Sequence, residues 1–196
     1  MHLKVIPIVC TLVYFGFVSA QAPIPSRPDG YGVGGPADAH VVVEMFFDPL
    51  CPGCKEAWPT VLQLIQAYGK TIHVRIHTFP LPYHTYSFVA SQGLHVIANV
   101  TNRNLDAIYR YATKVLENQA KWYDTATTSM NTLQVIDSLA SFVDKTGLTT
   151  KAKFLAGMNN PDINDQTRIS WKYACTRGKR KKLFTERSMK VFFPEH

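Results

Sequence analysis

Two cysteines with two residues between them, placed where a predicted strand meets a predicted helix, constrain the fold of this chain more than any other feature. The run His40–Phe47 is almost entirely β-branched or aromatic, which is typical of a strand buried on both faces. Asp48 breaks this run, and Pro52–Tyr68 then carries apolar residues at helical spacing. Cys51 and Cys54 therefore open a helix directly after a buried strand.

This position predicts thiol chemistry. Unpaired N–H groups and the macrodipole at a helix N-terminus stabilise a thiolate, so Cys51 is the expected nucleophile. It would attack a substrate disulfide, and Cys54 would resolve the mixed disulfide that forms. The spacer, Pro52 and Gly53, places both thiols in the first helical turn, where they can close into a disulfide. Pro59 removes one backbone hydrogen bond and is expected to kink the helix.

Two other uses of the cysteine pair are open. A zinc site would need further ligands, and the sequence has no second Cys pair or Cys/His pair at ligand spacing. His73 and His77 share one face of a predicted strand, which is more typical of packing than of a metal site. A purely structural disulfide is the stronger alternative, because secreted chains often carry them.

The first twenty residues predict a secretory signal. Lys4 gives a short positive start, Val5–Val18 is almost wholly apolar but shorter than the ~20 residues of a membrane span, and small residues precede Gln21. We therefore expect a mature chain without stable membrane insertion, secreted or in the endoplasmic reticulum lumen; an uncleaved N-terminal anchor is the alternative. Cys10 leaves with the signal. Asn99 begins a glycosylation sequon, which fits this route.

The remaining sequence predicts one α/β domain with a helical insertion. Residues 21–38 are a Pro/Gly-rich extended lead-in, and the domain spans 39–178 with the insertion at about 84–164. Thr71–Phe79 is a second strand, and Asp165–Thr176 is a helix that packs back on the sheet. Cys175 lies beside Trp171 and Tyr173 and is expected to be buried.

The insertion holds four helices with a 3.6-residue apolar period: Tyr86–Asn99, Asn104–Trp122 (N-cap Asn102 or Asn104), Met130–Thr146 (N-cap Ser129) and Lys151–Met158 (N-cap Thr149 or Thr150).

The net charge of +7 belongs mostly to the C-terminus. The last twenty residues carry +5 and Lys4 adds one, so the body of the chain is almost neutral. A neutral body gives no sign of a nucleic-acid partner.

Three segments resemble known families. Val43–Pro59, which contains Cys-Pro-Gly-Cys, looks like the active-site segment of DsbA-like disulfide oxidoreductases. Phe79–His84 and Trp171–Gly178 are similar to secreted, plant-type thioredoxin-superfamily proteins. The resemblance covers about residues 39–178. It implies a thioredoxin-like fold and thiol–disulfide exchange with protein dithiols or disulfides, or with glutathione, without a metal or organic cofactor.

The sequence departs from this pattern at the site. The family usually has a buried carboxylate six residues before the first cysteine, and this chain has Met45 there. Glu44 is one residue earlier and should face the other side of the strand. The dipeptide Pro52–Gly53 contains no histidine, so we expect weaker oxidising power than in relatives that have one.

A larger departure follows Gly178. The family continues with a Thr-Pro loop, whose cis proline abuts the disulfide, then two strands and a helix. Residues 179–196 are instead basic and stop soon after, so these elements are expected to be missing. We interpret this tail as an altered C-terminus, from a retained intron or a misplaced gene end. Transcript reads that splice across the junction in abundance would contradict that interpretation.

The sequence thus predicts a thiol–disulfide oxidoreductase of thioredoxin-like α/β fold. A secreted binding module with a structural disulfide and an inactive truncated isoform are the alternatives.

Overall fold

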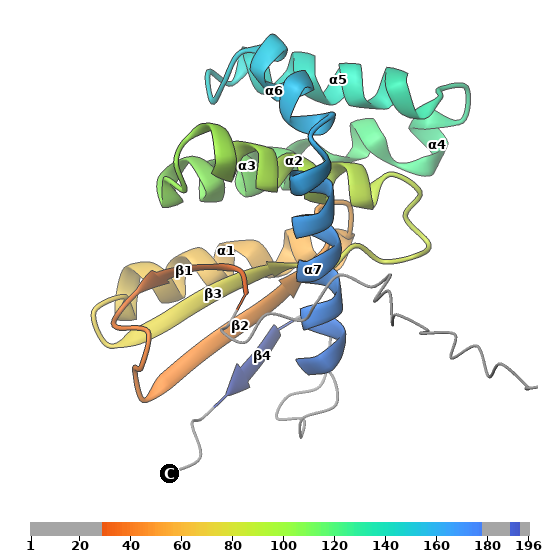
Figure 1. Cartoon of the computed structure of the whole chain (residues 1–196). Coiled ribbons are helices and arrows are strands. Elements are labelled where there is room, and N and C mark those ends of the chain that lie inside the picture. The colour runs from red at the N-terminus through yellow and green to blue at the C-terminus, as the bar shows by residue number, and fades with distance from the viewer. Residues whose placement is uncertain (1–28, 178–188, 193–196) are drawn as a thin grey trace, which may run out of the picture.

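The computed structural model describes residues 29–177 and 189–192, and these form a mixed sheet with helices on both faces (Figure 1). The predicted signal sequence lies outside the described residues. Within them the sheet has four strands in the order β1-β3-β2-β4. The central pair β2 and β3 is parallel, and both outer strands run antiparallel to their neighbours. The strands are β1 (Tyr31–Gly34), β2 (Val41–Phe47), β3 (Ile72–Thr78) and β4 (Met189–Phe192).

The centre of the fold is the unit of β2, helix α1 (Pro52–Tyr68) and β3. The two predicted strands and the predicted helix are therefore confirmed, with strand ends moved by one residue. The β-branched and aromatic residues of β2 are suited to a central strand, and α1 continues through Pro59. In register, Phe46 pairs with His77 and Phe47 pairs with Thr78, so the two strands end together at the edge that leads into Cys51.

Side chains of β2 alternate between two helical layers. Phe47 stacks on Trp58 of α1, with ring centroids 5.9 Å apart. Phe46 stacks on His77, which in turn stacks on Tyr173 of helix α7 (Pro161–Arg177). Figure 1 shows α1 behind the sheet and α7 crossing in front of it. This alternation follows from the two-residue period of a strand.

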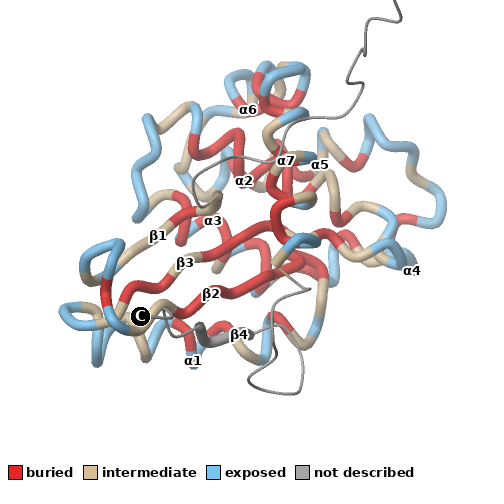
Figure 2. Tube along the Cα trace, turned by 60° about the horizontal axis from the view of Figure 1, so that its bottom comes forward, coloured by how far each residue is buried: buried red, intermediate tan, exposed pale blue. Residues whose placement is uncertain are grey.

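Between β3 and α7 the chain forms a helical block. The central helix α2 is buried around most of its surface, and Figure 2 shows buried residues concentrated along β2, β3 and α2. The predicted helices are present, although the second one continues as a 3-10 helix and the short α4 was not expected. The block consists of α2 (Ser87–Val100), α3 (Leu105–Asn118), η1 (Gln119–Trp122), α4 (Asp124–Thr127), α5 (Thr132–Lys145) and α6 (Lys151–Met158).

The helix N-caps mostly follow the sequence signals. The side chains of Asn104 and Thr150 accept hydrogen bonds from backbone N–H groups of α3 and α6, as predicted. The predicted cap Ser129 is wrong. Asn131 caps α5 instead, because its side chain and that of Gln134 each bond the other's backbone N–H in a capping box.

Both edges of the sheet differ from the sequence analysis. The glycine-rich lead-in was expected to be only extended, but it supplies β1, which pairs with β3. Gly30 precedes this strand and Gly34 ends it, with φ of +90° and +101°, a conformation that favours glycine. At the other edge, no strand was expected after Gly178, yet β4 pairs with β2. It satisfies backbone groups that an open edge would leave exposed.

Candidate functional site

The two cysteines lie at the N-terminus of α1, as predicted. Cys51 is the N-cap with an extended backbone, and Pro52 occupies the first helical turn, where its missing N–H costs no hydrogen bond. The Cys51 carbonyl accepts from the N–H groups of Cys54 and Lys55 at 3.1 and 3.2 Å. Cys51 is half-buried, whereas Cys54 is 1% exposed. Cys51 is therefore accessible from solvent, whereas Cys54 is not.

The surroundings of Cys51 favour its thiolate. Its pKa is lowered from 9.0 to about 6, chiefly by a hydrogen bond from the Cys54 thiol and also by the backbone N–H groups of Cys54 and Gly53. Partial burial and the negative charge of Asp48 act in the opposite direction but are outweighed. The lowered pKa favours the thiolate form of Cys51 at neutral pH.

Asp48 is a buried carboxylate beside the cysteines that the sequence analysis missed. Its Oδ1 accepts from the N–H of Leu50 at 2.7 Å and from the Ser87 hydroxyl, and its Oδ2 accepts from the N–H of Leu81 at 2.9 Å. His84 Nδ1 also donates to Oδ2, at 2.7 Å. The backbone N–H of Asp48 contacts Cys54 Sγ at 3.4 Å. The sequence showed Asp48 only as the residue that ends the strand.

Gln119 of the helical block holds the cysteine loop, residues 48–51 between β2 and α1, from outside the sheet. Gln119 is fully buried, and its Nε2 donates to the carbonyls of Pro49 and Cys51 at 3.0 and 3.2 Å. The hydroxyl of Tyr123 donates to Gln119 Oε1 at 2.7 Å. The helical block thereby fixes the backbone on which Cys51 sits.

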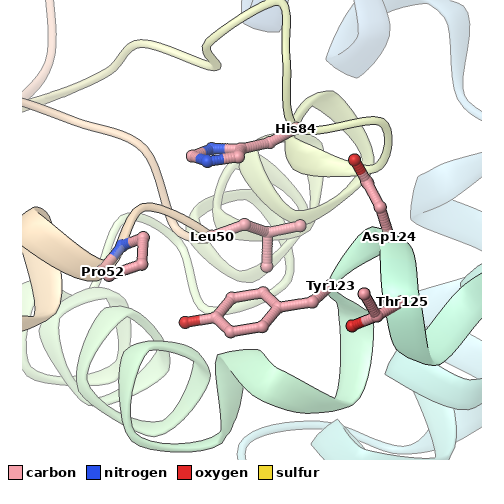
Figure 3. A pocket seen from close by; sticks show the side chains of 6 residues that line it. All are labelled: Leu50, Pro52, His84, Tyr123, Asp124 and Thr125. Carbon is pink, nitrogen blue, oxygen red and sulfur yellow. The ribbon is translucent and has the colours of Figure 1, made fainter.

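A pocket of about 250 Å³ opens beside this loop (Figure 3). Leu50 and Pro52, the neighbours of Cys51 in sequence, form part of its lining, and Tyr123 and His84 face them. The pKa of Tyr123 is raised, first by burial and then by the negative charge of Cys51, which is consistent with a site next to the thiolate. The full lining is Leu50, Pro52, His84, Tyr123, Asp124 and Thr125.

The opposite face of the sheet holds a separate charged cluster. Met45 is fully buried, and Glu44 faces away from it toward α7, as predicted from strand alternation. Glu44 Oε1 bonds His77 Nε2 at 3.1 Å, and its Oε2 accepts from Arg177 Nη2 at 2.5 Å. Burial raises the pKa of Glu44, but the hydrogen bonds from His77 and Arg177 outweigh it, and the pKa is lowered.

The other predicted residues lie away from the site. Asn99 is exposed at the end of α2, and its glycosylation stays a prediction. Cys175 is exposed, so the expectation that it is buried is wrong. Partial burial of its thiol raises its pKa. Its neighbour Tyr173 is buried, but residues two apart on a helix do not share a face.

Metal-binding clusters and membrane-spanning helices are both absent from the described residues. No group of three or more His, Cys, Asp or Glu there is arranged to hold a metal ion. No helix of the same part of the chain is long and apolar enough to cross a membrane.

Comparison with known proteins supports a fold assignment. A family model described as thioredoxin matches residues 30–178. No curated protein matches the chain. A protein of Pseudomonas syringae named as a candidate protein-disulfide isomerase is 19% identical, with a TM-score of 0.65 over 84% of this chain and 86% of that one. DsbA of Chlamydia trachomatis is 18% identical, with a TM-score of 0.62 over 81% and 80% of the two chains.

A third similar structure is the thiol-disulfide exchange protein alpha-DsbA2 of Wolbachia pipientis. It is 14% identical, with a TM-score of 0.59 over 84% of this chain and 76% of that one. At these identities the likeness is one of fold.

Proposed function

Because the chain belongs to the thioredoxin family, we propose that it is a thiol–disulfide oxidoreductase that acts on protein dithiols or disulfides through Cys51 and Cys54. The structures with which it shares its fold include a thiol-disulfide exchange protein and DsbA proteins. The observation that carries the proposal is the pairing of a half-buried, low-pKa Cys51 with a buried Cys54 in one helical turn.

The reaction follows from this geometry. The Cys51 thiolate attacks one sulfur of a substrate disulfide, forms a mixed disulfide and releases the other sulfur as a thiolate. Cys54 then loses its proton and attacks Cys51 Sγ, which releases the second substrate thiol and leaves Cys51 and Cys54 joined. Two electrons pass from the cysteine pair to the substrate. The reverse sequence oxidises a substrate dithiol.

We place this activity in the secretory pathway, in the endoplasmic reticulum lumen or outside the cell. The predicted signal sequence supports this location, and the predicted sequon at Asn99 is consistent with it. Protein thiols are the proposed partners, and glutathione is the proposed small-molecule partner.

Exchange with a disulfide-bonded peptide tests the proposed function. Purified wild-type protein should reduce the peptide when supplied with a reductant, and Cys51→Ser should abolish the reaction. Cys54→Ser should accumulate a mixed disulfide between Cys51 and the peptide, visible as an added mass. Cys175→Ser is the matched control and should react like wild type.

A structural disulfide would give a different pattern. Wild type would then be inert toward the peptide, and Cys51→Ser would instead lower the unfolding free energy of the oxidised protein by about 2–5 kcal/mol. Retained exchange in Cys51→Ser would equally contradict the proposed function.

A further inference from the structure

His84 and Asp48 form a hydrogen-bonded pair at the border of the pocket. His84 Nδ1 lies 2.7 Å from Asp48 Oδ2, and the Asp48 side chain is only 1% exposed. A carboxylate can only accept, so Nδ1 carries the proton, and the tautomer of the imidazole is fixed. Nε2 is then the atom through which His84 can exchange a proton with a partner outside the pair.

His84 is accessible to such a partner. Its side chain is 18% exposed and lines the pocket together with Leu50 and Pro52, the two neighbours of Cys51 (Figure 3). The pocket volume of about 250 Å³ has room for one large side chain or for half of a small disulfide. A substrate bonded to Cys51 therefore has a space beside it that an imidazole also borders.

We propose that this pocket receives the leaving half of the substrate disulfide, and that His84 is a general acid that protonates the leaving thiolate there. Asp48 is a positioning residue, since it holds the imidazole in the required tautomer. This inference rests on the proposed function and assigns a proton donor to it.

In the reducing direction, the proposed step begins with Cys51 as the thiolate and with a proton on both ring nitrogens of His84. As Cys51 Sγ bonds one substrate sulfur, the other sulfur leaves with the electron pair of the broken S–S bond and takes the Nε2 proton. Cys54 then closes the disulfide with Cys51, and its proton goes to the second substrate sulfur. In the oxidising direction, neutral His84 removes the proton from the attacking substrate thiol.

In this role, the contribution of His84 to the exchange rate depends on the pKa of the leaving thiol. An alkyl thiol has a pKa near 8.5 and leaves poorly as a free thiolate, so protonation assists it. An aromatic nitrothiobenzoate thiolate is far more stable, and it leaves without a proton. A general acid commonly contributes about 10²–10⁴-fold to a rate. A residue that only supports the fold would affect both substrates alike.

The test uses single-turnover reaction of the reduced protein with glutathione disulfide and with the nitrothiobenzoate disulfide. His84→Asn keeps a side-chain N–H that can donate to Asp48 but removes Nε2. We expect it to slow the reaction with glutathione disulfide by ~10-fold or more and that with the aromatic disulfide by ~2-fold or less. His40→Gln, an exposed histidine at the other end of β2, is the control and should match wild type.

Asp48→Asn tests the positioning role. It should change the ratio of the two rates in the same direction as His84→Asn, and the double variant should add little to that change, because both residues act in one step. Equal slowing with both disulfides, or no slowing in His84→Asn, would overturn the inference while the proposed function stands. A wild-type protein that reacts with neither disulfide would overturn both.

Discussion

Glu44 and Asp48 are buried carboxylates four residues apart, and they lie in different surroundings. Glu44 is 2% exposed and points toward α7, where its hydrogen-bond partners are the side chains of His77 and Arg177. Asp48 is 1% exposed and lies at the end of β2. Its partners are two backbone N–H groups, a hydroxyl and a histidine that borders a pocket.

Burial of a carboxylate does not by itself mark a reactive site. The partners of Glu44 hold the end of α7 against the sheet, and breaking such a pair leaves an uncompensated buried charge. Asp48 instead joins the cysteine loop to a group that substrate can reach. We therefore assign Glu44 to stability and Asp48 to the chemistry.

Exchanging each carboxylate for its amide should give the largest effects, and these should differ between the two positions. Glu44→Gln should lower the unfolding free energy by about 3 kcal/mol in urea titrations, since it leaves Arg177 without its buried partner. The folded variant should keep its exchange rate. Asp137→Asn, which removes an exposed ion pair with Lys151, is the control and should cost less than about 1 kcal/mol.

The comparison fails if the two roles are reversed. Slow exchange in Glu44→Gln at unchanged stability would place Glu44 in the chemistry. Wild-type exchange of glutathione disulfide in Asp48→Asn would remove Asp48 from it.

Gln119→Leu tests how the hydrogen bonds of Gln119 affect the fold and the pKa of Cys51. It leaves the carbonyls of Pro49 and Cys51 without their buried donor, so the unfolding free energy should fall by about 1–3 kcal/mol. The freed loop should also raise the pKa of Cys51 toward its ordinary value, measured by the pH dependence of alkylation. Gln63→Leu on the exposed face of α1 is the matched control and should do neither. An unchanged Cys51 pKa in Gln119→Leu would contradict the role given to Gln119.

Unfolding at acidic pH tests the stabilisation that the Glu44 carboxylate provides. The folded pKa of Glu44 lies below its ordinary value of 4.5, so the unfolded chain binds more protons as the pH falls. The stabilisation from this group is complete above pH 4.5 and is lost as the pH drops through the lowered pKa. Urea unfolding between pH 7 and 3 should show this loss, and Glu44→Gln should flatten it. An equal loss in the variant would assign the acid sensitivity elsewhere.

The smallest predicted effect is a difference in the pH dependence of alkylation between Cys51 and Cys175, the two accessible thiols. Cys51, with a pKa of about 6, should react with iodoacetamide at half its maximal rate near pH 6. Cys175, whose pKa is raised above 9.0, should react appreciably only in alkaline solution and serves as the internal control. Similar pH profiles for the two cysteines would show that the Cys54 thiol and the backbone N–H groups of the first helical turn do not stabilise the Cys51 thiolate.

Much of the fold was predictable because its signals are local. The buried run of β2, the helical period of α1 and the caps Asn104 and Thr150 each depend on a few neighbouring residues. The orientation of Glu44 also followed from strand alternation alone. The cysteine pair was found for the same reason, as it is a short motif at a strand–helix junction.

The remaining features depend on contacts between distant segments. Asp48 and His84 are 36 residues apart, and only the parallel pairing of β2 with β3 brings them together. Gln119 is 68 residues from the Cys51 carbonyl that it holds. The lead-in carries no strand pattern of its own, and β1 forms because β3 offers it an edge. No local pattern encodes such pairings.

A glutathione titration measures whether Cys51 and Cys54 form a redox couple. The protein is equilibrated at a series of glutathione ratios, free thiols are trapped by alkylation, and each cysteine is read by mass spectrometry. We expect Cys51 and Cys54 to oxidise together, with a potential between about −270 and −120 mV, while Cys175 does not follow them. A pair that stays joined at every ratio, or never joins, would contradict this expectation.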